Sequence, residues 1–318
     1  VVLRELSERV ELEMSVLDPN ERGRGLAWFL TPDGELDRRF SLQLSPRATL
    51  VRWDERPYVS PLVDVVDRGR PTGLILVGAE AVRLLHWEIG QVAEPARSLY
   101  EPEQRDWRDY DAYVGRAGGS AAAVHVATFD QRLEEWRQQF LSEAAAATSQ
   151  QVTGLDWHRI VVAGERRIAD IFIEELPASV RDRVIATLDA NLLWEELGPI
   201  AERLENVLDE AWRREARQLV DRAVETAKAG GTAALGWTEV LDCLIQHRVE
   251  HLVFAADARP DPDLLAPPIQ EALGRPAADM VVERAVEHAV ASGADITAVQ
   301  DDIPQLRQAG GVVAILRY

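Results

Sequence analysis

Apolar and polar residues alternate along the chain with a period that switches repeatedly between that of a helix and that of a strand. In the first part, apolar residues at helical spacing predict a helix over 3–17, which an Asp-Pro-Asn sequence ends. Strands are predicted over 25–30 and 40–53, with a turn at 31–34 between them. We expect residues 1–59 to form a short, partial N-terminal leader.

Residues 60–191 have the pattern of an α/β domain, in which apolar runs of strand length alternate with longer amphipathic segments. The predicted strands cover 73–78, 81–89, 92–97, 157–164 and 184–188, the last at a sheet edge, and the predicted helices cover 121–150 and 165–175. In the longer helix, one face is predicted to carry Phe129, Leu133, Trp136 and Phe140. Residues 100–119 are polar without clear periodicity, and a loop of this length is usually functional or disordered.

The remaining residues predict a linker helix over 192–231 and a second α/β domain over 232–318. Within that domain we expect helices at 237–247 and 276–292, strands at 251–255, 295–299 and 312–317, and a proline-rich loop at 259–268. Strands alternating with helices imply a mainly parallel or mixed sheet covered on both faces. The predicted fold class is therefore α/β.

Composition narrows the class of protein. Hydrophobic residues make up 47% of the 318 residues, as in globular proteins, and no apolar run reaches the roughly 18 residues of a membrane span. The single cysteine, Cys243, can form neither an internal disulfide nor a four-cysteine zinc site. The net charge of −19 argues against nucleic acid as a partner unless a local basic patch exists. We expect a cytoplasmic protein without a cofactor.

The C-terminal part contains an ordered set of short motifs. They are Gly236–Leu241 (GWTEVL), Arg248–Phe254 (RVEHLVF), Val286–Thr297 (VEHAVASGADIT) and Gly310–Tyr318 (GGVVAILRY). Together they resemble the third domain of archaeo-eukaryotic release factors and Pelota, whose last strand reads GG-(I/V)-x-A-I-L-R-Y. In physical terms, the two glycines predict a tight turn, the apolar run a buried strand, and Arg317-Tyr318 a cap at the sheet edge.

Two segments further upstream extend the resemblance to residues 56–318. Arg56–Asp64 (RPYVSPLVD) resembles the PYV-x-PL-(I/V)-D segment of bacterial members of this superfamily, which include the ribosome hibernation factor Balon. The strand pair that follows resembles the ribonuclease-H-like second domain of release factors. Gly115–Ala121 (GRAGGSA) stands where that domain carries its GGQ loop, ahead of a long helix.

The chain departs from the family pattern in two places. Ser120 replaces the GGQ glutamine, and the leader is too short for the codon-reading domain and has no NIKS-like tetrapeptide. A serine is shorter than a glutamine and cannot place the same amide, so we expect hydrolysis of peptidyl-tRNA to be weak or absent. The resemblance then implies a factor in ribosome hibernation or rescue that is not an enzyme. Its implied partners are rRNA near the ribosomal A site and a translational GTPase such as elongation factor Tu, with neither DNA nor membrane.

The glycine-containing loop is the expected contact site. Glycine tolerates the backbone conformations that close approach to a peptidyl-tRNA requires, and arginines and aromatic rings can bind phosphates and stack on bases. The expected contact residues are Arg105, Trp107, Arg108, Tyr110, Arg116, Gly118, Gly119 and Ser120. The aromatic residues of this loop, Tyr113 included, can equally anchor it to its own domain.

Other chemistry has weaker support in the sequence. His247 and His251 are four residues apart but lack zincin spacing, and His86 lies among apolar residues, as a structural histidine would. A two-metal nuclease needs several carboxylates on central strands, and the first predicted strands offer only Glu88. Two functional alternatives stay open: a peptidyl-tRNA hydrolase with a divergent loop, and a protein-binding adaptor away from the ribosome, which the negative charge favours.

Overall fold

The chain folds into two compact units. The computed structural model describes residues 2–16, 24–42, 44–46, 49–95, 99–100, 121–300 and 302–318. Unit 1 comprises Val1–Gly69 and Leu208–Tyr318, and unit 2 comprises Arg70–Val207. This division differs from the boundaries expected near residues 60, 192 and 232, because residues 60–69 and the second part of the linker helix pack with the C-terminal part of the chain.

Unit 2 contains a mixed sheet. Its strands are β3 (Thr72–Val77), β4 (Val82–Glu88), β5 (Gln91–Ala93), β6 (Leu99–Tyr100), β7 (Arg159–Gly164) and β8 (Val184–Asp189). They lie in the order β5-β4-β3-β7-β8, and β6 pairs with β4. The β3–β4 and β4–β5 pairs are antiparallel, whereas β3–β7 and β7–β8 are parallel. The predicted mixed sheet and the edge position of β8 are confirmed.

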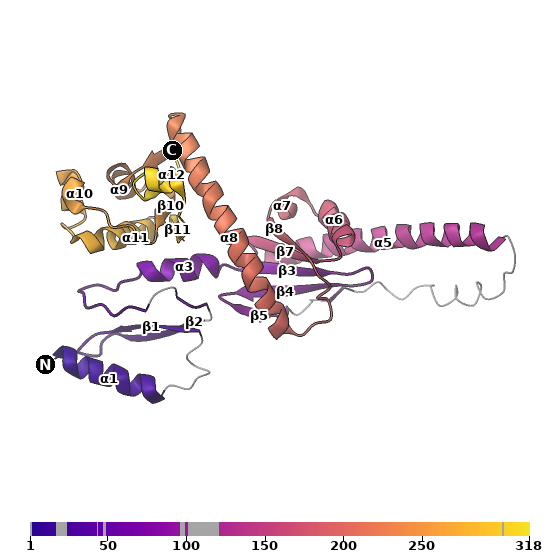
Figure 1. Cartoon of the computed structure of the whole chain (residues 1–318), viewed down its shortest axis with the longest axis horizontal. Coiled ribbons are helices and arrows are strands. Elements are labelled where there is room, and N and C mark those ends of the chain that lie inside the picture. The colour runs from indigo at the N-terminus through magenta and orange to yellow at the C-terminus, as the bar shows by residue number, and fades with distance from the viewer. Residues whose placement is uncertain are drawn as a thin grey trace. The chain divides into compact units, whose positions relative to one another are not determined.

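Helices cover one face of this sheet (Figure 1). They are α5 (Ala121–Gly154), α6 (Arg166–Glu175) and the short α7 (Ala178–Arg181). Ile75 and Val162 on the sheet share a core with Phe140 of α5 and Phe172 of α6. The predicted helices at 121–150 and 165–175 are therefore confirmed.

Gly73 on β3 is required by a neighbouring indole ring. A Cβ atom on Gly73 would lie 2.1 Å from the ring of Trp157, whose side chain is fully buried. The ring is held in place because its Nε1 donates a hydrogen bond to Nδ1 of His86, at 2.8 Å. The predicted structural role of His86 is confirmed by this bond.

The C-terminal part of unit 1 contains a second mixed sheet. Its strands are β9 (Ala233–Leu235), β10 (Val249–Ala255), β11 (Asp295–Val299) and β12 (Val312–Leu316), in the order β11-β10-β12-β9. Its helical segments are α8 (Leu197–Lys228, shared with unit 2), α9 (Trp237–Ile245), η1 (Pro262–Leu264), α10 (Pro267–Ala272), η2 (Ala278–Met280), α11 (Val281–Ala291) and α12 (Pro304–Gln308). The pair β10–β11 is parallel, and the other two pairs are antiparallel.

Successive side chains of this sheet point to opposite faces, and each face has its own core. Leu252 and Phe254 pack in the core that contains α9 and α11. Val253 between them packs in the core that contains α8 and α12. The sheet is therefore covered on both faces, as the sequence pattern predicts.

The closing motif forms an interior strand. Gly310 and Gly311 both adopt positive φ, at 75° and 84°, which confirms the predicted tight turn. The predicted edge cap is wrong, because β12 lies between β10 and β9. Arg317 instead donates hydrogen bonds to the carbonyl oxygens of Ser292 and Gly293 after α11.

Three predicted boundaries need correction. The loop at 259–268 contains η1 and the start of α10, because proline fits the first turn of a helix. The helix expected from residue 276 begins at Val281, after the η2 turn. The strand expected over 40–53 ends at Leu42, before Pro46, which has no N–H group for a strand ladder.

The leader consists of α1 (Val2–Val16) and the antiparallel hairpin of β1 (Gly25–Leu30) and β2 (Asp37–Leu42). The predicted turn between the strands closes through the amide of Gly34, which donates to the carbonyl oxygen of Thr31 at 3.1 Å. The leader thus contains the predicted helix and two strands, the second of them shorter than expected.

Residues 52–59, which we call the strap, are clamped by three carboxylates of η2 and α11. These acids recur every four residues, so they lie along one side of a helix. Asp279 pairs with Arg52 at 2.7 Å, and Glu287 pairs with Arg56 at 3.2 Å. Between them, the fully buried Glu283 accepts hydrogen bonds from the amides of Val59, at 2.7 Å, and Ser60, at 2.9 Å.

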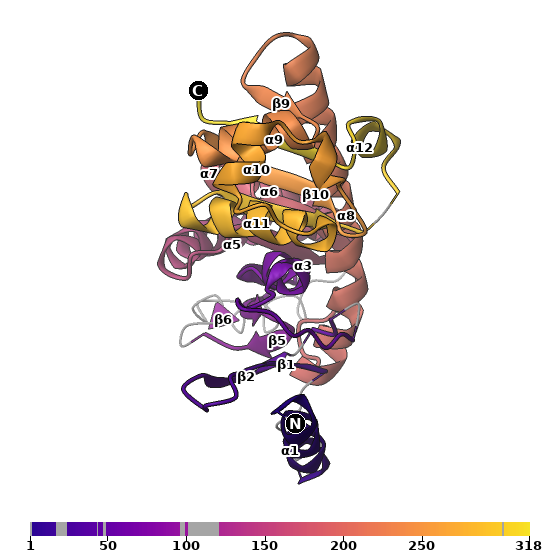
Figure 2. The same ribbon diagram turned by 90° about the vertical axis from the view of Figure 1, so that its left-hand side faces the viewer.

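The strap leads into α3 (Ser60–Arg68), a helix that the sequence pattern did not predict. It lies beside α11 in both views (Figures 1 and 2) and packs on β11. At its C-terminal end, the buried Asp67 accepts hydrogen bonds from Nε1 of Trp212, at 3.0 Å, and from Oγ1 of Thr297, at 2.9 Å. Buried carboxylates thus fix both ends of α3. Their hydrogen bonds join the segment around α3 to residues far along the chain.

No helix in the described parts of the chain is long and apolar enough to cross a membrane.

Glu283→Gln is expected to destabilise unit 1. The amide would point an N–H donor at a backbone N–H, and two charge-assisted hydrogen bonds would be weakened in a buried site. We expect the free energy of unfolding to fall by about 2–4 kcal/mol in urea titrations. The control is Glu287→Gln, which removes a partly exposed pair and should cost less than about 1 kcal/mol. Equal losses in the two variants would contradict this account.

Gly73→Ala is expected to destabilise unit 2 by about 1–3 kcal/mol, because the methyl group would overlap the Trp157 ring. Gly154→Ala is the matched control, since a Cβ atom there meets nothing within 4 Å. Differential scanning calorimetry should show a lower Tm for Gly73→Ala alone. A Tm as high as that of the control would refute the role assigned to Gly73.

Candidate functional site

The expected contact loop lies outside the described residues. This applies to all eight predicted contact residues: Arg105, Trp107, Arg108, Tyr110, Arg116, Gly118, Gly119 and Ser120. The structure does describe the elements on either side of residues 101–120. On one side β6 pairs antiparallel with β4, with Tyr100 opposite Val82 and Leu99 opposite Arg83. On the other side α5 begins at Ala121.

The C-terminal half of α5 attaches the helix to unit 2, and its N-terminal half extends beyond the sheet (Figure 1). Leu141 and Ala145 are buried in the core, and Glu134 forms an ion pair with Arg167 of α6 at 2.7 Å. The part of α5 from Ala121 to Glu134 is roughly 20 Å long. The N-terminal end of α5 therefore lies away from the body of unit 2.

The predicted apolar face of α5 is described only in part. Phe140 is buried and stacks on Trp136, with ring centroids 6.1 Å apart. Trp136 is 38% exposed, so it lies at the border of the core. The side chains of Phe129 and Leu133 lie outside the described part of the structure, and their position on this face stays a prediction.

Arg83 on β4 connects this strand to residues far along the chain, a role that the sequence did not indicate. Its guanidinium contacts both carboxylate oxygens of Glu94 at 3.1 Å. The same group donates to the carbonyl oxygens of Leu193, at 3.2 Å, and Glu195, at 2.9 Å. Because these acceptors lie far along the chain, only the fold reveals this arrangement.

The histidines considered as catalytic or metal-binding groups lie on different elements, His86 on β4, His247 in a turn and His251 on β10. His251 contacts Oγ1 of Thr297 at 3.0 Å, and His247 sits in the turn after α9 with a positive φ of 57°. Burial lowers the pKa of His288 on α11. Within the described ranges, no group of three or more His, Cys, Asp or Glu side chains is arranged to hold a metal ion.

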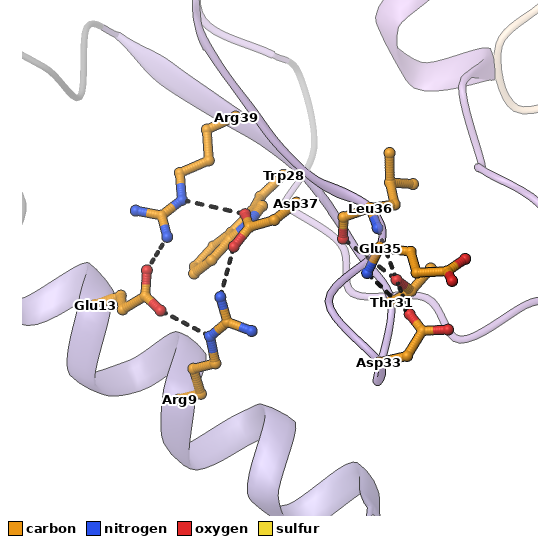
Figure 3. A network of polar contacts seen from close by, with 9 residues as sticks. All are labelled: Arg9, Glu13, Trp28, Thr31, Asp33, Glu35, Leu36, Asp37 and Arg39. Carbon is orange, nitrogen blue, oxygen red and sulfur yellow. Dashed lines mark hydrogen bonds and ion pairs between the residues drawn. The ribbon is translucent and has the colours of Figure 1, made fainter.

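In the leader, a ring of alternating charges joins α1 to the β1–β2 hairpin (Figure 3). Arg9 of α1 pairs with Glu13 on the same helix, at 2.8 Å, and with Asp37 of β2, at 2.5 Å. Arg39 of β2 closes the ring by pairing with Glu13 and, at 3.7 Å, with Asp37. Trp28 donates to Asp37 at 2.8 Å and lies 4.0 Å from the Arg39 guanidinium. Both arginines are engaged inside the leader, so their charges are balanced locally.

Comparison with known proteins assigns the chain to one family through a family model. A model of bacterial archaeo-eukaryotic release factor family 10 matches residues 57–228, just over half of the chain. The Bacillus subtilis (strain 168) protein YocB is 22% identical over 181 residues, which are 57% of this chain and 66% of YocB.

Two solved structures are also similar. Archaeoglobus fulgidus Pelota has a TM-score of 0.38 and 17% identity, over 79% of this chain and 66% of Pelota. Saccharomyces cerevisiae Dom34, a translation termination-like factor involved in RNA quality control and interacting with Hbs1, has a TM-score of 0.42 and 9% identity, over 80% of this chain and 64% of Dom34. The chain spans just under two thirds of each of these relatives, and the family assignment rests on the family model.

Glu13→Gln is expected to loosen α1, because it weakens two ion pairs of the ring and an isolated helix of this length is marginal in water. Hydrogen exchange should show faster exchange of the α1 amides in this variant. Raising the salt concentration should speed exchange in the unmodified protein as well, since the pairs are partly exposed. Glu8→Gln is the control, because Glu8 pairs only within α1, with Arg4. Equal acceleration in both variants would contradict docking by the ring.

Proposed function

Because the chain belongs to bacterial archaeo-eukaryotic release factor family 10, we propose that it is a translation factor that binds the ribosome and extends residues 101–120 toward the peptidyl-transferase centre without catalysing peptide release. Its role on this proposal is hibernation of idle ribosomes or rescue of stalled ones.

The observation that carries the proposal is the geometry of α5. The helix is anchored in the core of unit 2 by its C-terminal half and extends beyond the sheet toward Ala121, where residues 101–120 join it. A loop at the end of a long helix can reach into a narrow site while the globular part of the unit stays outside. This is the geometry that a factor needs to contact the peptidyl-transferase centre from the A site.

The residues of the loop suit contact better than catalysis. Gly118 and Gly119 allow close backbone approach, whereas Ser120 lacks the side-chain amide of the GGQ glutamine. We assign phosphate contacts to Arg105, Arg108 and Arg116, and base stacking to Trp107 and Tyr110. These assignments are part of the proposal.

The domain architecture and the partners are likewise proposed. We assign a ribonuclease-H-like fold to unit 2, since the antiparallel strands β3, β4 and β5 are followed by β7 and β8, which extend the sheet in parallel from β3. The expected binding surface is rRNA near the A site. A translational GTPase such as elongation factor Tu is the proposed protein partner.

Two alternatives lead to different experimental results. A peptidyl-tRNA hydrolase would release labelled peptide from stalled ribosomes, and Gly119→Pro would abolish that release. A protein-binding adaptor would not bind ribosomes at all, and the net charge of −19 favours this alternative over the first.

Co-sedimentation with 70S ribosomes tests the proposal. We expect the protein to pellet with vacant or stalled ribosomes and to release no labelled peptide. Changing Arg105, Arg108 and Arg116 together to Glu should reduce the pelleted fraction about tenfold or more, through lost phosphate contacts and added repulsion. The control changes three exposed arginines outside the loop to Glu: Arg38, Arg166 and Arg222.

The two triple variants separate local contact from net charge, because each changes the total charge equally. If both lose binding equally, the loop is not the contact. If the unmodified protein stays in the supernatant with vacant, stalled and stressed ribosomes, ribosome binding itself is refuted.

A further inference from the structure

Trp194 is held at the surface of unit 2 in an open hollow. It is 67% exposed, although the two residues before it, Leu192 and Leu193, are buried at 1% and 6%. The hollow has a volume of about 480 Å³. Its lining residues are Arg83, Glu94, Trp194, Glu195, Glu196 and Leu197. Tryptophan is enriched at protein interfaces, because its large ring is apolar while its N–H group is polar.

Hydrogen bonds from Arg83 fix the backbone around Trp194. Arg83 donates to the carbonyl oxygens of Leu193 and Glu195, the residues on either side of the tryptophan. The same guanidinium also contacts both carboxylate oxygens of Glu94. Arg83 therefore serves as a support for the hollow, and its charge is balanced by Glu94.

Two further glutamates give the hollow a surplus of negative charge. Glu195 pairs through Oε1 with Arg203 at 3.0 Å, while its Oε2 is enclosed and has no hydrogen-bond partner among the described residues. Glu196 is exposed, and it forms no ion pair with any residue in the described ranges. Carboxylate oxygens with unused capacity thus lie next to an exposed indole ring.

We propose that this hollow binds an arginine side chain of a basic protein segment. A planar guanidinium can stack on the indole face of Trp194 while its N–H groups donate to the exposed carboxylate of Glu196. The carboxylates that line the hollow repel phosphate, so the hollow selects a basic protein segment over nucleic acid. None of the lining residues belongs to residues 101–120, and the proposal does not depend on the proposed binding to the ribosome.

The test is the binding of a fluorescein-labelled Gly-Ser peptide with three arginines to the full chain, measured by fluorescence anisotropy. A peptide with citrulline at the arginine positions keeps the shape and removes the charge. We expect saturable binding of the arginine peptide and none of the citrulline peptide. Trp194→Ala should weaken binding about 3- to 10-fold, and Glu196→Gln about 2- to 5-fold. Both residues are exposed, so folding should be unaffected.

Matched controls separate the hollow from the overall negative charge of the chain. Trp53→Ala removes a tryptophan that is 56% exposed in unit 1, and Glu174→Gln removes an exposed carboxylate of α6. Neither should change the affinity by more than the experimental error. The proposal is overturned if Trp194→Ala binds the peptide as well as these controls do. It is also overturned if a single-stranded RNA oligonucleotide binds in a manner that Trp194→Ala abolishes.

Discussion

A buried carboxylate, that of Glu283, fixes how the N-terminal and C-terminal parts of the chain join. A charge with no exposure to water is costly unless strong hydrogen bonds compensate it. Glu283 receives them from the amides of Val59 and Ser60, at the positive end of the α3 dipole. The N-terminal end of α3 and the Glu283 carboxylate therefore stabilise each other. The same hydrogen bonds hold the strap in one position along α11. Asp67 fixes the other end of α3 in the same way.

This arrangement makes unit 2 an insertion between α3 and the second part of α8. The chain leaves unit 1 after Gly69 and returns to it at Leu208, so the sheet of unit 2 and α5 lie within one continuous stretch. The family model begins at the strap and ends at the last residue of α8. The matched region thus contains both connections, the inserted unit and residues 101–120.

The sequence predicted the elements whose stability is local or whose pattern is strongly apolar. Strands β3, β7 and β12 are continuous apolar runs, and they were found with errors of only a few residues. Helix α3 was missed because its stability comes from Glu283, which lies far along the chain, and because its buried positions include Asp64 and Asp67. The contact loop was predicted from resemblance, and its residues lie outside the described structure. The surface at Trp194 depends on Arg83, which no local pattern connects to it.

The most direct test of the central claim is to locate residue 119 on the ribosome. Cys243 is the single cysteine, it is buried, and burial raises the pKa of its thiol, so a Gly119→Cys variant can be labelled selectively with an iron chelate. Hydroxyl radicals generated at this position in a complex with 70S ribosomes cleave the rRNA nearby. The account predicts cleavage of the large-subunit rRNA at the peptidyl-transferase centre. Cleavage confined to other regions, or none above the level of an unlabelled control, would contradict it.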